Sequence, residues 1–152
     1  MSIPITLAAV DIKSIRRSVG IPSDSELGKL LGIVTQQIKE IFPDFEDPFK
    51  ITQNSVPYKH HVELIDDEND IANKSENYKS LNGLEIDLYK SENWSKEGRA
   101  IVLNIGKFPG HVKPLHITVG FNKNGFTDEV LDQIKVLILE IVEQHNLSNS
   151  KL

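Results

Sequence analysis

Lys113-Pro114-Leu115-His116-Ile117-Thr118-Val119-Gly120-Phe121 is the most regular stretch of this sequence, because apolar and polar residues alternate along it. In an extended chain Leu115, Ile117 and Val119 face one way, and residues 116, 118 and 120 face the other. This period of two predicts a β-strand with one face in a hydrophobic core. The other face would hold an imidazole, a hydroxyl and, at Gly120, open space, which together can accommodate an anion. The alternative is an ordinary half-buried strand whose solvated side happens to carry His116 and Thr118.

A second predicted strand, residues 58–65, carries another histidine on an alternating face. Val62 and Leu64 would lie on one side, and His61 and Glu63 on the other. Residues two apart on a strand share a face and lie roughly 7 Å apart. If the strands at 58–65 and 113–121 are close in space, they direct two imidazoles into one cleft.

The remaining patterns predict an α+β fold with helices covering one side of a sheet. The apolar run 3–12 is expected to be a central strand buried on both faces. A helix is expected from Ser23, with Glu26 completing a capping box, to about Phe42. Strands are expected at 84–89 and 99–105, joined by a turn at 91–98. A last helix, capped by Thr127, should fray after Asn146.

Length and composition limit the possible functions. The 152 residues are expected to form a single domain, 1–152, and the absence of cysteine excludes disulfides, thiolate catalysis and cysteine-ligated metals. A net charge of −5 argues against a long nucleic-acid duplex as the partner. No apolar run is long enough for a membrane span, and the stretch Ile3 to Val10 lacks the basic flank of a signal peptide. We therefore expect a cytoplasmic protein with no membrane partner.

Two imidazoles in one cleft suit the cleavage of a cyclic phosphate or phosphodiester. One histidine takes a proton from the incoming water or hydroxyl, and the other gives a proton to the leaving oxygen on the opposite side. Each such group contributes about 10²–10⁴ in rate. Thr118 would donate a hydrogen bond to a non-bridging phosphoryl oxygen.

In these features the chain resembles the two-histidine (2H) phosphoesterases, in their LigT-like and Swiss Army knife branches. Members carry two His-x-Ser/Thr-x motifs with apolar x. His116-Ile117-Thr118-Val119 matches this motif, whereas His61-Val62-Glu63-Leu64 has Glu63 where the family has Ser or Thr. An ionised carboxylate cannot donate a hydrogen bond to phosphate, so Glu63 would instead orient His61 or bind a ribose hydroxyl or a base edge.

The resemblance implies a bilobed α+β fold with antiparallel-rich sheets, helices on the outer side and a central cleft. It also implies a metal-independent, cofactor-free phosphodiesterase with His61, His116, Thr118 and Glu63 in its catalytic site. The substrate would be a small cyclic nucleotide, a cyclic oligonucleotide or an RNA 3′ end with a 2′,3′-cyclic phosphate. Compact phage and viral relatives destroy cyclic-nucleotide signals of host defence, which would place the protein in the host cytoplasm. A monomer or weak homo-oligomer is expected.

Two other functions remain open. The fold could bind and sequester a cyclic nucleotide without cleaving it, because the first motif lacks its hydroxyl. A metal hydrolase would use the four residues His60, His61, Glu63 and His116, whose types suit zinc although no established zinc spacing is present.

Candidate substrate-binding residues flank the two motifs: Tyr58, His60, Lys107, Phe108 and His111. The last three lie in the loop 106–111, which leads into the strand with His116. His60 has two alternatives: a histidine at the edge of the core, or the reactive residue after a one-residue slip of its strand. His111 has the alternative of a plain surface residue. Stacking on a base is a further possibility for Tyr58, Tyr89, Trp94 and Phe108, against ordinary packing for each.

Overall fold

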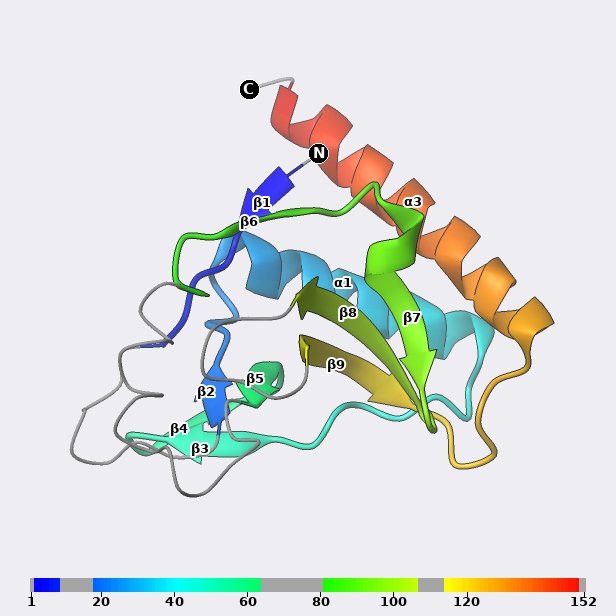
Figure 1. The fold of residues 1–152 in the computed structure, drawn as a ribbon, viewed down its shortest axis with the longest axis horizontal. Coiled ribbons are helices and arrows are strands. Elements are labelled where there is room, and N and C mark those ends of the chain that lie inside the picture. The colour runs from blue at the N-terminus through cyan, green and yellow to red at the C-terminus, as the bar shows by residue number, and fades with distance from the viewer. Residues whose placement is uncertain (1, 9–17, 64–80, 107–113, 151–152) are drawn as a thin grey trace.

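A computed structural model describes residues 2–8, 18–63, 81–106 and 114–150 of the chain. Over these ranges the protein is α+β, with antiparallel sheets and two α-helices, α1 (Glu26–Ile41) and α3 (Asp128–Ser150) (Figure 1). The α+β class expected from the sequence is confirmed.

The largest sheet has five strands in the order β2-β5-β9-β8-β7, and every neighbouring pair is antiparallel. The strands are β2 (Ser18–Gly20), β5 (His61–Glu63), β9 (Leu115–Phe121), β8 (Ala100–Gly106) and β7 (Trp94–Glu97). The strand predicted at 113–121 is therefore β9, which occupies the centre of this sheet. Its alternating apolar residues Leu115, Ile117 and Val119 are all buried.

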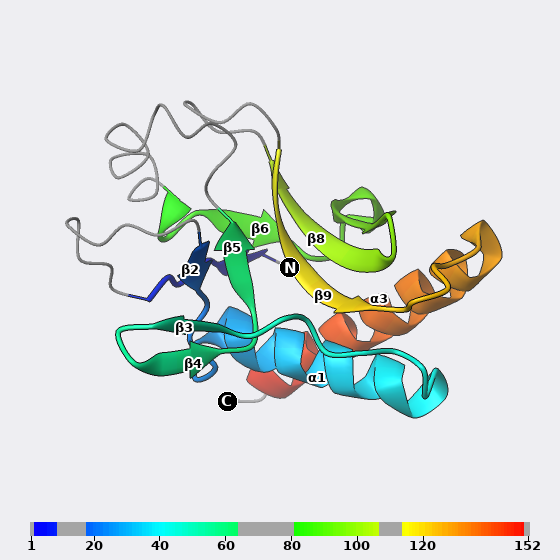
Figure 2. The same ribbon diagram turned by 90° about the horizontal axis from the view of Figure 1, so that it is seen from below.

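Both helices lie on the side of the sheet to which these apolar residues point, as Figure 2 shows with α1 and α3 beneath β9. The helices are amphipathic, so each turns an apolar face to the sheet and to the other helix. The buried residues of α1 include Leu27, Leu30, Leu31, Val34 and Ile38. Ile41, which the sequence places on the same stripe, is instead 56% exposed. It is the last residue of α1, beyond the part of the helix that the core covers.

The start of α1 and the end of α3 differ from those predicted. Ser25, not Ser23, caps α1, because its Oγ accepts a hydrogen bond from the Gly28 N–H at 3.1 Å. Thr127 caps α3 as predicted: its Oγ1 accepts from the Val130 N–H at 3.1 Å. The end of α3 does not fray after Asn146 but continues to Ser150. There the Asn149 amide donates to the Glu26 carboxylate of α1.

The prediction of a central strand at 3–12 is wrong. Only β1 (Ser2–Pro4) is a strand in the described part of this stretch, and it pairs with β6 (Glu85–Asp87) in a separate two-stranded sheet. Beyond β1 the backbone forms hydrogen bonds with two different segments. The Ile5 N–H donates to the carbonyl of residue 84 and its carbonyl accepts from the N–H of residue 83, whereas the Ala8 N–H donates to the Gly20 carbonyl. Because these groups are satisfied by two different partners, the apolar residues are buried without a continuous ladder. Residues 9–12 lie outside the described ranges.

Several short strands lie where none was predicted, and only the last residue of one of them, Tyr58, falls in a predicted strand, 58–65. β7 occupies half of the predicted turn 91–98, after a short 3₁₀ helix, η3 (Ser91–Asn93). The turn itself is reduced to two residues, Gly98 and Arg99, and the φ of Gly98 is +59°. β3 (Ile51–Gln53) and β4 (Val56–Tyr58) form a hairpin whose turn residues, Asn54 and Ser55, both have positive φ. The predicted strands 84–89 and 99–105 contain β6 and β8, which belong to different sheets.

Candidate active site

The two histidine-bearing strands are neighbours in the five-stranded sheet. β5 pairs with β9 in antiparallel register, with Val62 opposite Ile117. Both of these residues are fully buried on the helix side. One step along this register, His61 lies beside Thr118 and Glu63 lies beside His116, and all four project from the opposite face. The sheet thus gathers the four predicted catalytic residues into one cluster.

His61 is the more buried histidine of this cluster. Its Nδ1 atom is buried and has no hydrogen-bond partner among the described residues. Burial lowers the pKa of His61 below the ordinary value, and the neighbouring His116 lowers it further, while Glu63 partly opposes the shift. His61 is therefore neutral at neutral pH and can accept a proton.

His116 is held by a carboxylate from β7. Its Nδ1 lies 3.3 Å from Oε2 of Glu97, and both side chains are partly exposed. This contact occupies Nδ1 and leaves Nε2 as the ring nitrogen available to exchange a proton with a substrate. Sequence reasoning missed Glu97, because it stands in the stretch assigned to a turn. The only signal for it would have been recognition of β7 as a strand of this sheet.

The polar face continues over the strands next to β9. Asn104 of β8 is paired with His116, and its amide donates to the Ser95 hydroxyl of β7 at 2.8 Å. Thr118 is half-buried opposite Val102, with its hydroxyl on the same face as the two histidines. A row of hydrogen-bonding groups on one side of a sheet can bind the oxygens of a phosphate ester.

The open space expected at Gly120 is not there. A side-chain carbon at this position would lie 2.4 Å from the Phe45 ring and 2.6 Å from the Glu46 carbonyl oxygen. Residue 46 forms a bridge to Phe121, which seats Phe45 over the glycine. Gly120 therefore makes room for a neighbouring segment, and an anion would have to lie nearer His61 and Thr118.

His60 points away from this cluster, toward α1. It is buried, and its Nε2 lies 3.1 Å from the Thr35 Oγ1, which in turn donates to the Val119 carbonyl at 2.8 Å. Because the Thr35 hydrogen is used on Val119, the His60 Nε2–H must be the donor between them. Burial, assisted by Lys59 and His61, lowers the pKa of His60 to about 4. The alternative of a slipped strand with His60 as the reactive group is contradicted by the β5–β9 register.

A metal centre is not formed by the residues that the structure describes: they contain no group of three or more His, Asp or Glu side chains arranged to hold a metal ion. His60 precedes β5 and points toward α1, whereas His61 lies on the opposite face of the sheet. The four residues considered for zinc therefore cannot converge on one point.

The aromatic residues that were considered for base stacking lie in different environments. The Tyr58 ring lies against Gly20, where a side-chain carbon would be 2.3 Å from the ring, and Gly20 pairs with His61. Tyr58 is therefore close to the histidine cluster. Trp94 is fully buried and donates its Nε1–H to the Leu88 carbonyl, so a base-stacking role for it is wrong. Tyr89 bonds through its hydroxyl to Glu143 of α3.

Lys107, Phe108 and His111, the other predicted substrate-binding residues, lie outside the described ranges. A cavity of about 380 Å³ lies next to Tyr58, between residues 21–24 and residues 56–60.

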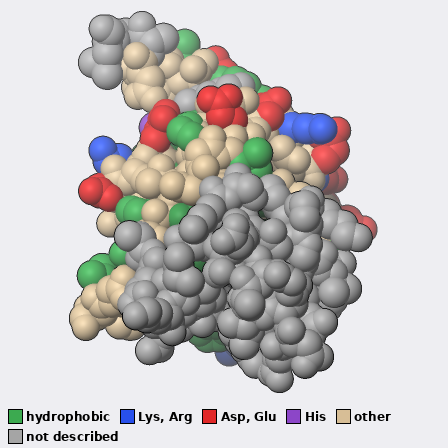
Figure 3. Space-filling view, turned by 60° about the vertical axis from the view of Figure 1, so that its left-hand side comes forward, with side chains coloured by type: hydrophobic (Ala, Val, Ile, Leu, Met, Phe, Trp, Pro, Cys, Tyr) green, Lys and Arg blue, Asp and Glu red, His purple; other side chains and the backbone are tan. Residues whose placement is uncertain are grey.

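On the described part of the face shown in Figure 3, acidic side chains gather beside hydrophobic ones, with isolated Lys or Arg side chains at the margins. Over the described ranges no helix has the length and apolar character needed to cross a membrane.

The chain was compared with family models, curated proteins and solved structures, and none of them matches it. The arrangement of its own residues is therefore the basis for a functional assignment.

Proposed function

We propose that the protein is a metal-independent phosphodiesterase of the 2H type, which opens a cyclic phosphate by two-histidine acid–base catalysis. The observation that carries the proposal is the β5–β9 register, with Val62 opposite Ile117. This register puts two imidazoles and one hydroxyl on the same face of the sheet. Substrates of suitable size are small cyclic nucleotides and RNA ends with a 2′,3′-cyclic phosphate.

The environments of the two histidines favour different roles. His61 has a lowered pKa and is neutral, so it takes the proton from the attacking water. His116 has the Glu97 carboxylate 3.3 Å from its Nδ1, which orients the ring with Nε2 available to the substrate. His116 gives its Nε2 proton to the leaving oxygen as the P–O bond breaks. Thr118 donates a hydrogen bond to a non-bridging oxygen as charge develops on the phosphoryl group.

The same proposal extends to the fold. An antiparallel sheet with both helices on one face, and the histidines on the other, is compatible with a LigT-like domain. The cleft would lie over β5 and β9.

Sequestration without cleavage is the second candidate. Glu63 is exposed beside His116, where the family has a hydroxyl donor, and Glu97 adds a second carboxylate. Two carboxylates close to a phosphate weaken binding of the doubly charged transition state more than binding of a singly charged diester. Such a site can hold a cyclic nucleotide without opening it.

The test is incubation of the purified protein, in excess chelator, with 2′,3′-cyclic mononucleotides and cyclic dinucleotides, with the products resolved as 2′- or 3′-phosphates. We expect turnover by the wild type and a loss of about 10²-fold or more in His61→Ala and in His116→Ala. His145→Ala on α3, away from the cluster, is the matched control and should retain full activity. Recovery of bound but intact nucleotide would support sequestration. A rate for His61→Ala within a few-fold of wild type would refute the two-histidine mechanism.

A further inference from the structure

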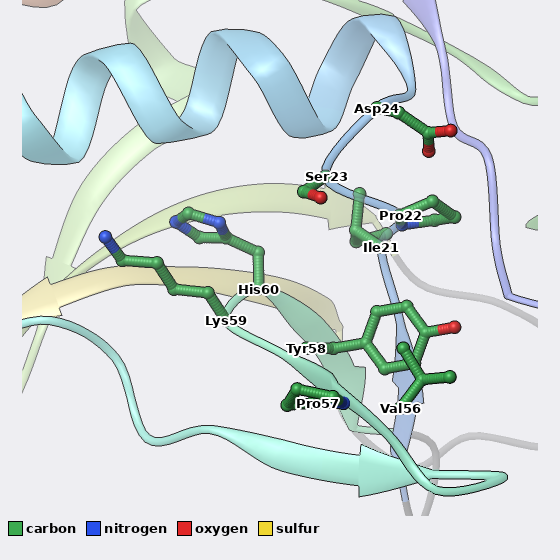
Figure 4. A pocket seen from close by; sticks show the side chains of 9 residues that line it. All are labelled: Ile21, Pro22, Ser23, Asp24, Val56, Pro57, Tyr58, Lys59 and His60. Carbon is green, nitrogen blue, oxygen red and sulfur yellow. The ribbon is translucent and has the colours of Figure 1, made fainter.

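The cavity beside Tyr58 has two walls of different origin (Figure 4). One wall is the segment 21–24, which joins β2 to α1, and the other is β4 with the two residues that follow it. Figure 4 shows Val56 and Tyr58 projecting toward Ile21 and Pro22, while the His60 ring lies at the far end of the cavity. The volume of about 380 Å³ is within the range of small-molecule sites.

The walls are flat and apolar in the middle and polar at the rim. Tyr58 supplies an aromatic ring, Pro22 a second flat apolar group, and Val56 an aliphatic surface that is 46% exposed. At the rim Figure 4 shows the Asp24 carboxylate and the Tyr58 hydroxyl on the same side of the cavity. Asp24 is exposed and has no hydrogen-bond or ion-pair partner in the described part of the chain. A planar ligand with N–H donors on its edge fits this combination.

One wall of the cavity, at Tyr58, borders the histidine cluster. The ring of Tyr58 rests on Gly20, and Gly20 is the residue opposite His61 in the β2–β5 pair. Paired residues of antiparallel strands project to the same face, so the ring occupies the space that a side chain at position 20 would fill, beside His61. The Tyr58 side chain therefore lines the cavity and also lies at the edge of the proposed active site.

We infer that the cavity binds the base of a nucleotide whose phosphate lies at His61 and His116, and that Asp24 makes guanine the preferred base. Guanine presents two adjacent N–H donor groups, N1–H and N2–H₂, and one carboxylate can accept from both. Adenine presents an acceptor at N1 and cannot make this pair. The phosphate half of the inference rests on the proposed function, whereas base binding does not.

Two measurements test the inference separately from catalysis. The first is binding of guanosine and adenosine, which carry no phosphate, followed by chemical-shift changes in the labelled protein. We expect guanosine to bind in preference to adenosine and to shift the signals of residues 22–24 and 58. Asp24→Asn should lose about ten-fold or more of this preference, whereas Asp44→Asn, a change at another exposed aspartate, should retain it.

The second measurement is hydrolysis of guanosine and adenosine 2′,3′-cyclic phosphates. Tyr58→Ala should raise KM about ten-fold with little change in kcat, since base stacking contributes about 1–3 kcal/mol. Phe49→Ala, at an aromatic that is 77% exposed outside the cavity, is the control for loss of a surface ring. Circular dichroism checks that Tyr58→Ala is folded. If Tyr58→Ala does not fold, Asp24→Asn still tests the base site, because Asp24 is exposed.

The outcomes distinguish this inference from the proposed function. Hydrolysis with no guanosine binding, and with the same base preference in Asp24→Asn as in wild type, would overturn the base site and leave the phosphodiesterase intact. Guanosine binding that depends on Asp24, without hydrolysis of any cyclic nucleotide, would support the base site and overturn the catalytic proposal.

Discussion

At the residue scale, the two histidines of the cluster differ because their neighbours differ. His61 is partly buried with an unpartnered Nδ1 in the described structure, whereas His116 is more open and paired with Glu97. In the proposed mechanism these different environments give identical side chains opposite proton-transfer roles. The following two predictions concern one histidine each.

The pH dependence of activity should reflect the lowered pKa of His61. Because the base must be neutral, the acidic limb of the kcat/KM profile is expected below pH 6.5, the ordinary histidine value. Glu63 raises the pKa of His61, so Glu63→Gln removes an opposing effect and should move this limb to still lower pH. Rate measurements across pH, with an NMR titration of His61, check the direction. A limb that moves to higher pH in Glu63→Gln would contradict the assignment of His61 as the base.

Glu97 is expected to position His116 for the reaction without contributing to the stability of the fold. An exposed ion pair is worth about 0–1 kcal/mol, so Glu97→Gln should lower kcat by up to about five-fold. The free energy of unfolding should change by no more than about 0.5 kcal/mol. Salt screens such pairs, and the difference in kcat between wild type and Glu97→Gln should shrink at about 1 M salt. Equal kcat values at low salt would show that Glu97 has no role in the reaction.

At the element scale, close approach of the backbone at two glycines sets the position of β9 and β2. Phe45 and the Glu46 carbonyl lie over Gly120, and Tyr58 lies over Gly20. The Thr35 hydroxyl of α1 adds a third constraint, because it connects the His60 ring to the Val119 carbonyl, next to Thr118. Helix, strand and hairpin are thus fixed relative to one another around the cluster.

Two glycine-to-alanine substitutions, one at the close approach and one away from it, test this packing. Gly120→Ala places a carbon 2.4 Å from the Phe45 ring and 2.6 Å from a backbone oxygen, so neighbouring atoms must shift. We expect a loss of about 1–3 kcal/mol in the free energy of unfolding. Gly32 lies in α1 with no other atom within 4 Å of an added carbon. Gly32→Ala should therefore stabilise the protein by about 0.5–1 kcal/mol. Urea denaturation of both variants measures the contrast, and a neutral Gly120→Ala would refute the close approach.

At the scale of the whole molecule, one hydrophobic cluster joins the five-stranded sheet, the β1–β6 sheet and both helices. His60 is one of the few polar side chains buried in the described structure. Its pKa of about 4, against an ordinary 6.5, means that the folded protein binds fewer protons than the unfolded chain between these two values. Stability therefore rises with pH across this window.

The expected size of this effect is measurable. The contribution of a neutral His60 is fully present above pH 6.5 and is lost as pH falls toward 4, by about 3 kcal/mol if the full shift is realised. His60→Gln keeps a donor for Thr35 but does not titrate, so its stability should depend less on pH in this window. The lowered pKa of His61 remains in both proteins and contributes in the same direction. Urea unfolding at pH 4.5 and pH 7 checks the difference, and parallel pH dependences would contradict a buried neutral His60.

The sequence by itself determined the elements whose signals are local. Alternation identified β9, the three- and four-residue spacing of apolar side chains identified α1 and α3, and Thr127 marked the start of α3. It also determined which histidines share a face with Glu63 and Thr118, because strand geometry has a period of two. These features depend on residues within a few positions of one another, so the linear order of the chain contains them.

Only the tertiary structure decided the features that depend on partners distant in sequence. The short strands β2 and β7 have too few apolar residues to be recognised alone, and pairing with β5 and β8 makes them strands. The same long-range packing put Phe45 over Gly120, Thr35 against His60 and Glu97 beside His116. A β-sheet pairs residues by register in space, and that register is not written in any local pattern.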